Sequence, residues 1–238
     1  MPSVRLGTLI LVSYSLILLP VKAETSIGTA VSLNVRGELL TNRHVVDDCK
    51  SLAIRTRANE LYPARTIAKS NKFDLAAISV EGYTPERIVW LSTNQNRYVR
   101  VPTNGMRLLY GGFDTDDAEI VDIANGEAVG NTSPDSFISQ MRSSATHGAS
   151  GSGVFDQTGG LIGIVFSGRH DTYPNTPGRP WSYFGKNLVN FYNNNAVVEF
   201  LQSEARIEAS YLADAPLVPR DLVVGLIFAA SVMVVCER

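Results

Sequence analysis

Three positions of this sequence have the residue types and the chain order of a nucleophilic catalytic group: His44, Asp74 and a serine near residue 150. A serine hydroxyl is a weak nucleophile at neutral pH, so it needs a base such as an imidazole to take its proton. The imidazole needs an anion on its other ring nitrogen, and the attacked carbonyl needs N–H donors for its developing charge. The stretch "HGASGSGVF" over residues 147–155 provides a glycine-rich turn and two candidate nucleophiles, Ser150 and Ser152.

The neighbours of the histidine and the aspartate agree with this chemistry. His44 follows the β-rich run "LLTN", so we expect it where a strand ends in a short turn. Asp74 opens the apolar run "DLAAISV", which predicts a partly buried carboxylate. Asp47 and Asp48 are alternative partners, but they lie within one turn of His44 and are better explained as capping or solvated residues.

The sequence lacks the patterns of several other functional classes. It contains no HExxH, CxxC or GxGxxG pattern, so we expect neither a bound metal nor a nucleotide cofactor. A net charge of -2 over 238 residues gives no electrostatic reason to expect a nucleic-acid partner.

Short β-rich segments recur along the central part of the chain, and most are separated by Gly, Asn, Asp or Pro. Examples are residues 29–35, 51–56, 106–113 and 161–168. This punctuation is typical of an all-β sandwich or barrel. One helix is expected late in the chain, capped by Asn195, with one face formed by Val198, Leu201, Ala205, Ala209 and Leu212.

The segments "TNRHVV", "FDLAA" and "GASGSGV…GGLIGI" together resemble the trypsin-like serine proteases, particularly the bacterial HtrA-like branch. The resemblance runs from about Ile27 to Leu201. It implies two packed six-stranded antiparallel β-barrels followed by a C-terminal helix. It also implies an active site in the cleft between the barrels, with His44 and Asp74 on the first barrel and the serine on the second.

The resemblance further implies roles for individual residues. In the G-x-S-G pattern the nucleophile is the third residue, which is Ser150, and Ser152 remains the fallback. The oxyanion donors would be the backbone N–H groups of Gly148 and Ser150. The primary substrate pocket would contain no carboxylate, which favours small or medium apolar residues; its expected lining is Ser144, Thr146, Phe166 and Gly168.

The two ends of the chain are predicted to lie outside the protease domain of residues 24–212. Residues 1–23 have a basic start, an apolar core and small residues before position 24, which is typical of a signal peptide, with an uncleaved anchor as the alternative. Residues 213–238 are predicted to form a linker and an apolar tail. The uncharged run Leu222–Cys236 in this tail is open to three interpretations: a membrane-associated segment, a docked strand or helix, or a loosely ordered end.

The chain has only two cysteines, Cys49 in the domain and Cys236 in the tail. Because the two lie in separate predicted parts, Cys49 is expected to be unpaired or bonded to another chain.

The predicted function is that of a serine endopeptidase that cleaves polypeptides and acts in the periplasm or after secretion. Two alternatives stay open at this point. One is a catalytically silent fold of this type that is used for binding. The other is esterase activity by the same three residues, since the chemistry does not distinguish an amide from an ester.

Overall fold

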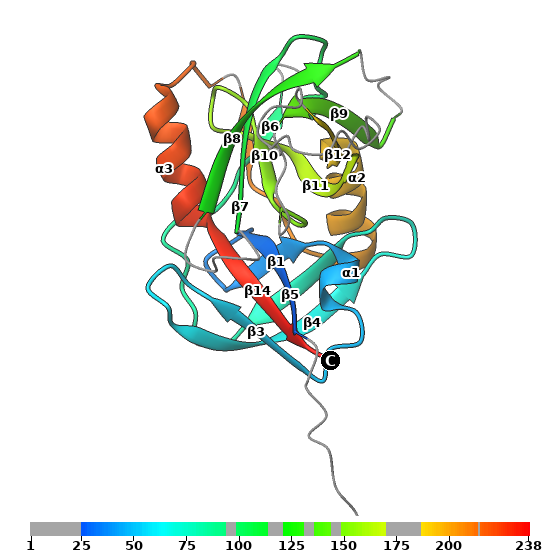
Figure 1. Ribbon diagram of the computed structural model, residues 1–238, viewed down its shortest axis with the longest axis vertical. Helices are drawn as coiled ribbons and strands as arrows, with labels where there is room; N and C mark the ends of the chain where they lie inside the picture. The colour runs from blue at the N-terminus through cyan, green and yellow to red at the C-terminus, as the bar shows by residue number, and fades with distance from the viewer. Residues whose placement is uncertain are drawn as a thin grey trace, which may run out of the picture.

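Two β-barrels stacked on one another make up most of the described structure (Figure 1). The structure is a computed structural model, and it describes residues 25–93, 99–113, 121–130, 136–143, 149–169, 187–213 and 215–238.

The first barrel is a closed ring of six antiparallel strands. In ring order they are β1 (Thr25–Ser32), β14 (Ser231–Glu237), β3 (Ser51–Arg55), β4 (Leu61–Lys69), β5 (Ala76–Val80) and β2 (Glu38–Thr41).

The second barrel is also a ring of six antiparallel strands, because β10 pairs with β7 on one side and β11 on the other. In ring order they are β7 (Arg107–Phe113), β8 (Val121–Val129), β9 (Ile138–Ser143), β12 (Asn187–Asn193), β11 (Leu161–Arg169) and β10 (Gly153–Phe155). Two short strands, β6 (Leu91–Thr93) and β13 (Tyr211–Ala213), extend it in parallel from β11. The prediction of an all-β fold with two six-stranded barrels is confirmed.

Apolar side chains fill the inside of each barrel and the layer between the barrels. Successive residues of a strand point to opposite faces, so Leu39 packs inside the first barrel while Leu40 packs in the layer shared with the second. In the second barrel, Ile162 lies inside and Ile164 joins that shared layer. The shared layer fixes the two barrels against each other. A site formed by residues of both barrels is therefore held in one arrangement.

The predicted late helix is present, with different ends. Helix α2 spans Asn194–Phe200 and continues as a π-turn over Leu201–Ala205. Its N-cap is Asn193, whose side chain accepts from the N–H of Asn195, so the prediction of Asn195 as the cap is wrong by two residues. Ala209 and Leu212 lie beyond the helix, and Leu212 belongs to β13.

The prediction that residues 213–238 lie outside the domain as a linker and apolar tail is wrong, and of the three interpretations of residues 222–236 the docked one is correct. Helix α3 (Arg220–Ala230) packs on the shared apolar layer, and β14 then runs down the first barrel between β1 and β3 (Figure 1). The first barrel therefore takes five strands from the start of the chain and its sixth from residues 231–237. None of the helices in the described ranges is long and apolar enough to cross a membrane.

The apolar run 222–236 divides into two elements because its halves are buried in different ways. Val223, Ile227 and Ala230 recur at helical spacing on the buried face of α3. From Ser231 the backbone is extended, and five of the seven residues of β14 are buried. Val234 points into the first barrel, and Met233 packs outward against Phe113 of β7.

The two cysteines form a disulfide, so the prediction that Cys49 is unpaired or bonded to another chain is wrong. Cys49 and Cys236 are 187 residues apart in sequence, and their Cα atoms are 5.3 Å apart. The pairing follows from β14, which brings residue 236 beside the segment after α1 (Arg43–Val46). The disulfide thus attaches the sixth strand covalently to the part of the chain that carries His44.

We expect the double substitution Cys49→Ala and Cys236→Ala to lower the free energy of unfolding by about 2–5 kcal/mol, because a crosslink over so long a loop restricts the unfolded chain. Chemical denaturation measures this change. Dithiothreitol should destabilise the wild type and leave the double variant unchanged. Equal stability of oxidised wild type and variant would contradict the expectation.

Candidate functional site

His44 and Asp74 form a pair at the rim of the first barrel. His44 lies in the one-turn helix α1, directly after β2, and Asp74 lies just before β5. Nδ1 of His44 is 2.5 Å from Oδ2 of Asp74, and the backbone N–H of His44 donates to Oδ1 at 2.9 Å. Both carboxylate oxygens therefore hold the same histidine. The side chains are 49% and 27% exposed, so the aspartate is partly buried, as predicted, and the imidazole can be reached from solvent.

Two further side chains fix the backbone of Asp74. The buried Asn42 donates from Nδ2 to the carbonyl oxygen of Asp74 at 2.8 Å. Tyr192, on β12 of the second barrel, accepts the N–H of Asp74 on its hydroxyl oxygen at 3.0 Å. The aspartate is thus held by both barrels.

Asp47, the alternative partner of His44, forms ion pairs with other residues. It pairs with Lys69 at 2.7 Å and with Arg43 at 3.2 Å. Burial alone would raise the pKa of the Asp47 carboxyl, but the hydrogen bonds and charges of Lys69 and Arg43 outweigh burial and hold that pKa below its ordinary value. Asp47 therefore stays ionised beside these two cations, and Asp74 is the partner of the imidazole.

Ser150 lies in a tight turn between the barrels. The N–H of Ser152 donates to the carbonyl of Ala149, with Gly151 at φ +87° between them. The N–H of Gly151 bonds the carbonyl of Val165 on β11, which ties the turn to the second barrel. A Cβ atom on Gly151 would collide with the carbonyl oxygen of Thr29, so the position requires glycine for both its backbone angle and its space.

Thr29 of β1 connects this turn to the first barrel. Its N–H donates to the carbonyl of Ser150 at 2.8 Å, and its own carbonyl accepts from the hydroxyl of Thr41 at 2.6 Å. Its hydroxyl accepts the N–H of Phe113, on β7. Next to it, a Cβ on Gly28 would meet both Val45 of α1 and the carbonyl of Ser150. The serine turn and the helix that carries His44 thus lie against the same short piece of β1.

The hydroxyl of Ser152, the second candidate nucleophile, is buried beside β7. Ser152 is 0% exposed, and its hydroxyl lies where a side chain on Gly112 of β7 would be. Within the described part of the chain this hydroxyl has no hydrogen-bond partner. A fully buried hydroxyl cannot meet a substrate, so the geometry favours Ser150.

Only part of the predicted substrate pocket falls within the described residues. Phe166 is half-buried on β11 and stacks on Tyr192, with ring centroids 4.3 Å apart. The backbone of Gly168 pairs with Val189 in the same sheet. Ser144, Thr146 and the predicted oxyanion residue Gly148 lie outside the described residues. Tyr192 therefore contacts both the aspartate and the one pocket side chain that is described.

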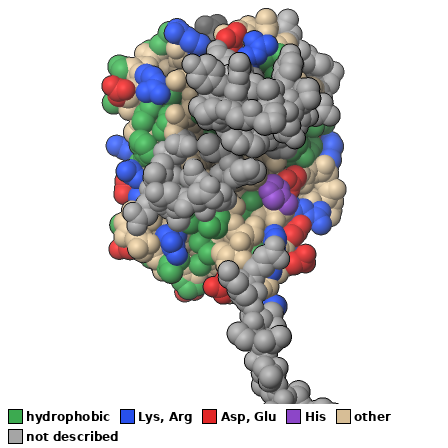
Figure 2. Space-filling model, viewed as in Figure 1, with side chains coloured by type: hydrophobic (Ala, Val, Ile, Leu, Met, Phe, Trp, Pro, Cys, Tyr) green, Lys and Arg blue, Asp and Glu red, His purple; other side chains and the backbone are tan. Residues whose placement is uncertain are grey.

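The exposed position of His44 agrees with a site at the rim of the first barrel. In Figure 2 the histidine side chain lies at the surface against an acidic side chain.

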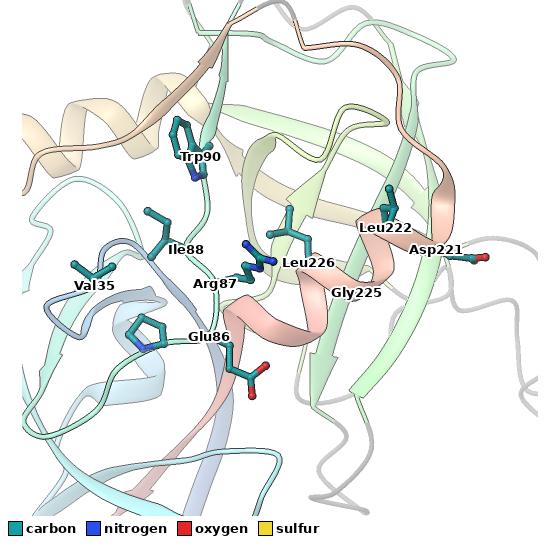
Figure 3. Close-up of a pocket in the computed structure, with 10 residues that line it drawn as sticks. Val35, Glu86, Arg87, Ile88, Trp90, Asp221, Leu222, Gly225 and Leu226 are labelled. Carbon is teal, nitrogen blue, oxygen red and sulfur yellow. The ribbon is translucent and has the colours of Figure 1, made fainter.

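A hollow of about 650 Å³ lies elsewhere, between α3 and the segment before β6 (Figure 3). Its lining is mostly apolar but includes the charged residues Glu86, Arg87 and Asp221. It contains none of His44, Asp74 or Ser150. In the described ranges, no three His, Cys, Asp or Glu residues gather as they would to hold a metal ion.

Sequence reasoning missed the residues that position the site. Asn42 was visible in the segment "TNRH", but its contact with Asp74 depends on how β2 and β5 pair. Thr29 and Tyr192 have no local signal, because each acts on a residue more than 100 positions away. Only the assembled barrels reveal them.

The fold and the site define a class: a double β-barrel with a His–Asp pair on one barrel and a serine turn on the other. The chain matches the family model of the trypsin-like peptidase domain over residues 28–164. It therefore belongs to the trypsin-like peptidase domain family.

Known relatives are distant. The chain is 28% identical over 149 residues to the uncharacterized protein y4bJ of Sinorhizobium fredii, covering 61% of this chain and 22% of that protein. It is 25% identical over 140 residues to a probable serine protease do-like of Buchnera aphidicola, covering 58% and 29%. The HtrA-type protease AlgW, solved with a decapeptide, shares the fold with a TM-score of 0.57 and 19% identity, covering 74% of this chain and 50% of that one. This chain therefore spans half or less of the length of these proteins.

The serine turn gives a direct test of the geometry. We expect Gly151→Ala to lower the thermal midpoint strongly and to block reaction of Ser150 with a fluorophosphonate, because the new Cβ collides with Thr29. Gly82→Ala is the matched control, since Gly82 also has positive φ (+75°) but a Cβ atom at that position would meet no other atom within 4 Å. That variant should cost only about 1 kcal/mol. Similar behaviour of the two variants would contradict the tight approach of the serine turn to β1.

Proposed function

We propose that this chain is a serine endopeptidase that cleaves polypeptides through His44, Asp74 and Ser150. One observation carries the proposal: both carboxylate oxygens of Asp74 hold His44, whose helix borders the same stretch of β1 that fixes the Ser150 turn. This arrangement joins the base, its orienting anion and the nucleophile-bearing turn, as the triad mechanism needs. Membership of the trypsin-like peptidase domain family supports the same function.

The proposed mechanism follows from the direction of the hydrogen bonds. Nδ1–H of His44 donates a hydrogen bond to Oδ2 of Asp74, and this tautomer leaves Nε2 free to accept a proton. Nε2 takes the proton of Ser150 as its Oγ attacks the substrate carbonyl, and it later gives that proton to the leaving amine. Asp74 remains ionised and stabilises the imidazolium that forms between these steps.

The oxyanion would be held by backbone N–H groups of the serine turn. The N–H of Ser150 donates to no backbone carbonyl among the described residues, which is consistent with a role toward substrate. The second donor that we propose is the N–H of Gly148. Two such fixed donors stabilise the charge of the tetrahedral intermediate without needing to reorganise.

For the substrate, we propose polypeptides cleaved after small or medium apolar residues. The described side chain of the pocket wall is the aromatic Phe166, which has no charge for an Arg or Lys to pair with. AlgW, which shares this fold, was solved with a decapeptide. Ser144, Thr146 and Gly168 complete the proposed pocket.

We propose that the protease domain acts outside the cytoplasm, in the periplasm or after secretion, once residues 1–23 have been removed as a signal peptide. The Cys49–Cys236 disulfide supports this location, because such bonds persist in oxidising compartments.

The nucleophile is tested by a fluorophosphonate probe on the purified protein, with the labelled residue mapped by mass spectrometry. We expect labelling at Ser150, and we expect Ser150→Ala to abolish both labelling and peptide cleavage. Ser152→Ala is the matched control two residues away and should keep substantial activity, since its buried hydroxyl has no partner among the described residues. Full labelling of Ser150→Ala would refute the assignment.

The anion that orients the base is tested by kcat/KM on a small ester. Asp74→Asn should keep the fold and reduce the rate by roughly 10⁴-fold, since the amide permits the wrong tautomer of His44. Asp47→Asn, which removes a carboxylate three residues from His44, is the control and should retain most of the rate. Equal effects of the two substitutions would argue against the triad.

A further inference from the structure

The helix that carries His44 is too short to hold itself in place. Helix α1 has only four residues, and Asn42 at its N-cap makes no side-chain capping bond. Isolated helices of this length are unstable in water, and their last carbonyl groups have no partner inside the helix. The direction of the imidazole therefore depends on contacts that reach α1 from other parts of the chain.

Two residues from distant parts of the sequence bond the backbone of α1. Asp74 accepts the backbone N–H of His44 on one side. On the other side, Arg238 donates from Nη2 to the carbonyl of His44 at 3.0 Å and from Nε to the carbonyl of Asp47 at 3.2 Å. A planar guanidinium can bond two carbonyls at once, and a cation is favourable at the C-terminal end of a helix. Arg238 thus caps the open end of α1.

Arg238 is itself held firmly by its surroundings. It follows β14, which is paired on both sides in the first barrel. The carbonyl of Glu237 accepts the N–H of Lys50 at 2.8 Å, and Cys236 is bonded to Cys49. The guanidinium therefore reaches α1 from a fixed strand.

We propose that Arg238 is a positioning residue for the imidazole of His44, acting through the backbone of α1. The inference rests on the proposed function, because it assigns His44 the role of base. Displacement of a catalytic group by about 1 Å can reduce a rate by roughly 100-fold. Removing the guanidinium should thus slow the chemical step while leaving substrate binding largely unchanged.

The test compares Arg238→Ala, Arg238→Lys and Arg36→Ala in the purified chain, with a small ester substrate and a fluorophosphonate probe. Arg36 is the matched control, because it is an exposed arginine on the same barrel whose guanidinium, among the described residues, pairs only with Glu38. We expect Arg238→Ala to reduce kcat and the rate of Ser150 labelling by roughly 10- to 100-fold, with KM within about twofold of wild type. Arg238→Lys should recover part of the rate, since an ammonium can bond one of the two carbonyls. Arg36→Ala should match wild type.

Three results would overturn the inference. The first is wild-type kcat and labelling in Arg238→Ala, which would leave the proposed function standing. The second is a loss of kcat in Arg238→Ala that Arg238→Lys does not relieve and that is accompanied by a lower thermal midpoint. That result would make Arg238 merely structural. The third is a wild-type protein that is not labelled at Ser150, which would overturn the proposed function together with this inference.

Discussion

The hydrogen bond from the N–H of Thr29 to the carbonyl of Ser150 is the contact on which the site depends. It joins the first barrel to the serine turn, which is otherwise tied to the second barrel through Gly151 and Val165. Thr29 is fully buried, and it makes further hydrogen bonds to Thr41 and Phe113. The requirement for glycine at position 151 follows from the closeness of this approach.

The aspartate is under a similar constraint from both barrels. Tyr192 holds its N–H from the second barrel, while Asn42 holds its carbonyl from the first. Because the ring of Tyr192 also stacks on Phe166, the proposed substrate wall and the proposed acid–base pair share one aromatic side chain. Among the described residues, the proposed nucleophile, anion and pocket wall are therefore held by contacts between the two barrels.

The sequence was enough to find the His44–Asp74 pair but not the residues that hold it in place. His44 and Asp74 stand in recognisable local contexts, and their pairing is present as expected. The G-x-S-G pattern already favoured Ser150 over Ser152, and the full burial of Ser152, which no local pattern reveals, agrees with that choice. The run 222–236 was ambiguous because a continuous apolar stretch suits a buried helix as well as a buried strand. It contains one of each, and the pairing of Cys49 with Cys236 could be seen only once β14 was placed.

The position of β14 also sets an order of events during synthesis. Chains are made from the N-terminus, so His44 and Asp74 exist long before the strand that closes their barrel. Until residues 231–237 appear, β1 and β3 each have an open edge, and α1 lacks the disulfide and the guanidinium that fix it. Contacts between residues so far apart in sequence form slowly. A half-made chain would thus carry the proposed catalytic residues without their geometry, and a newly made protease of this kind would be inert until its last barrel strand is in place.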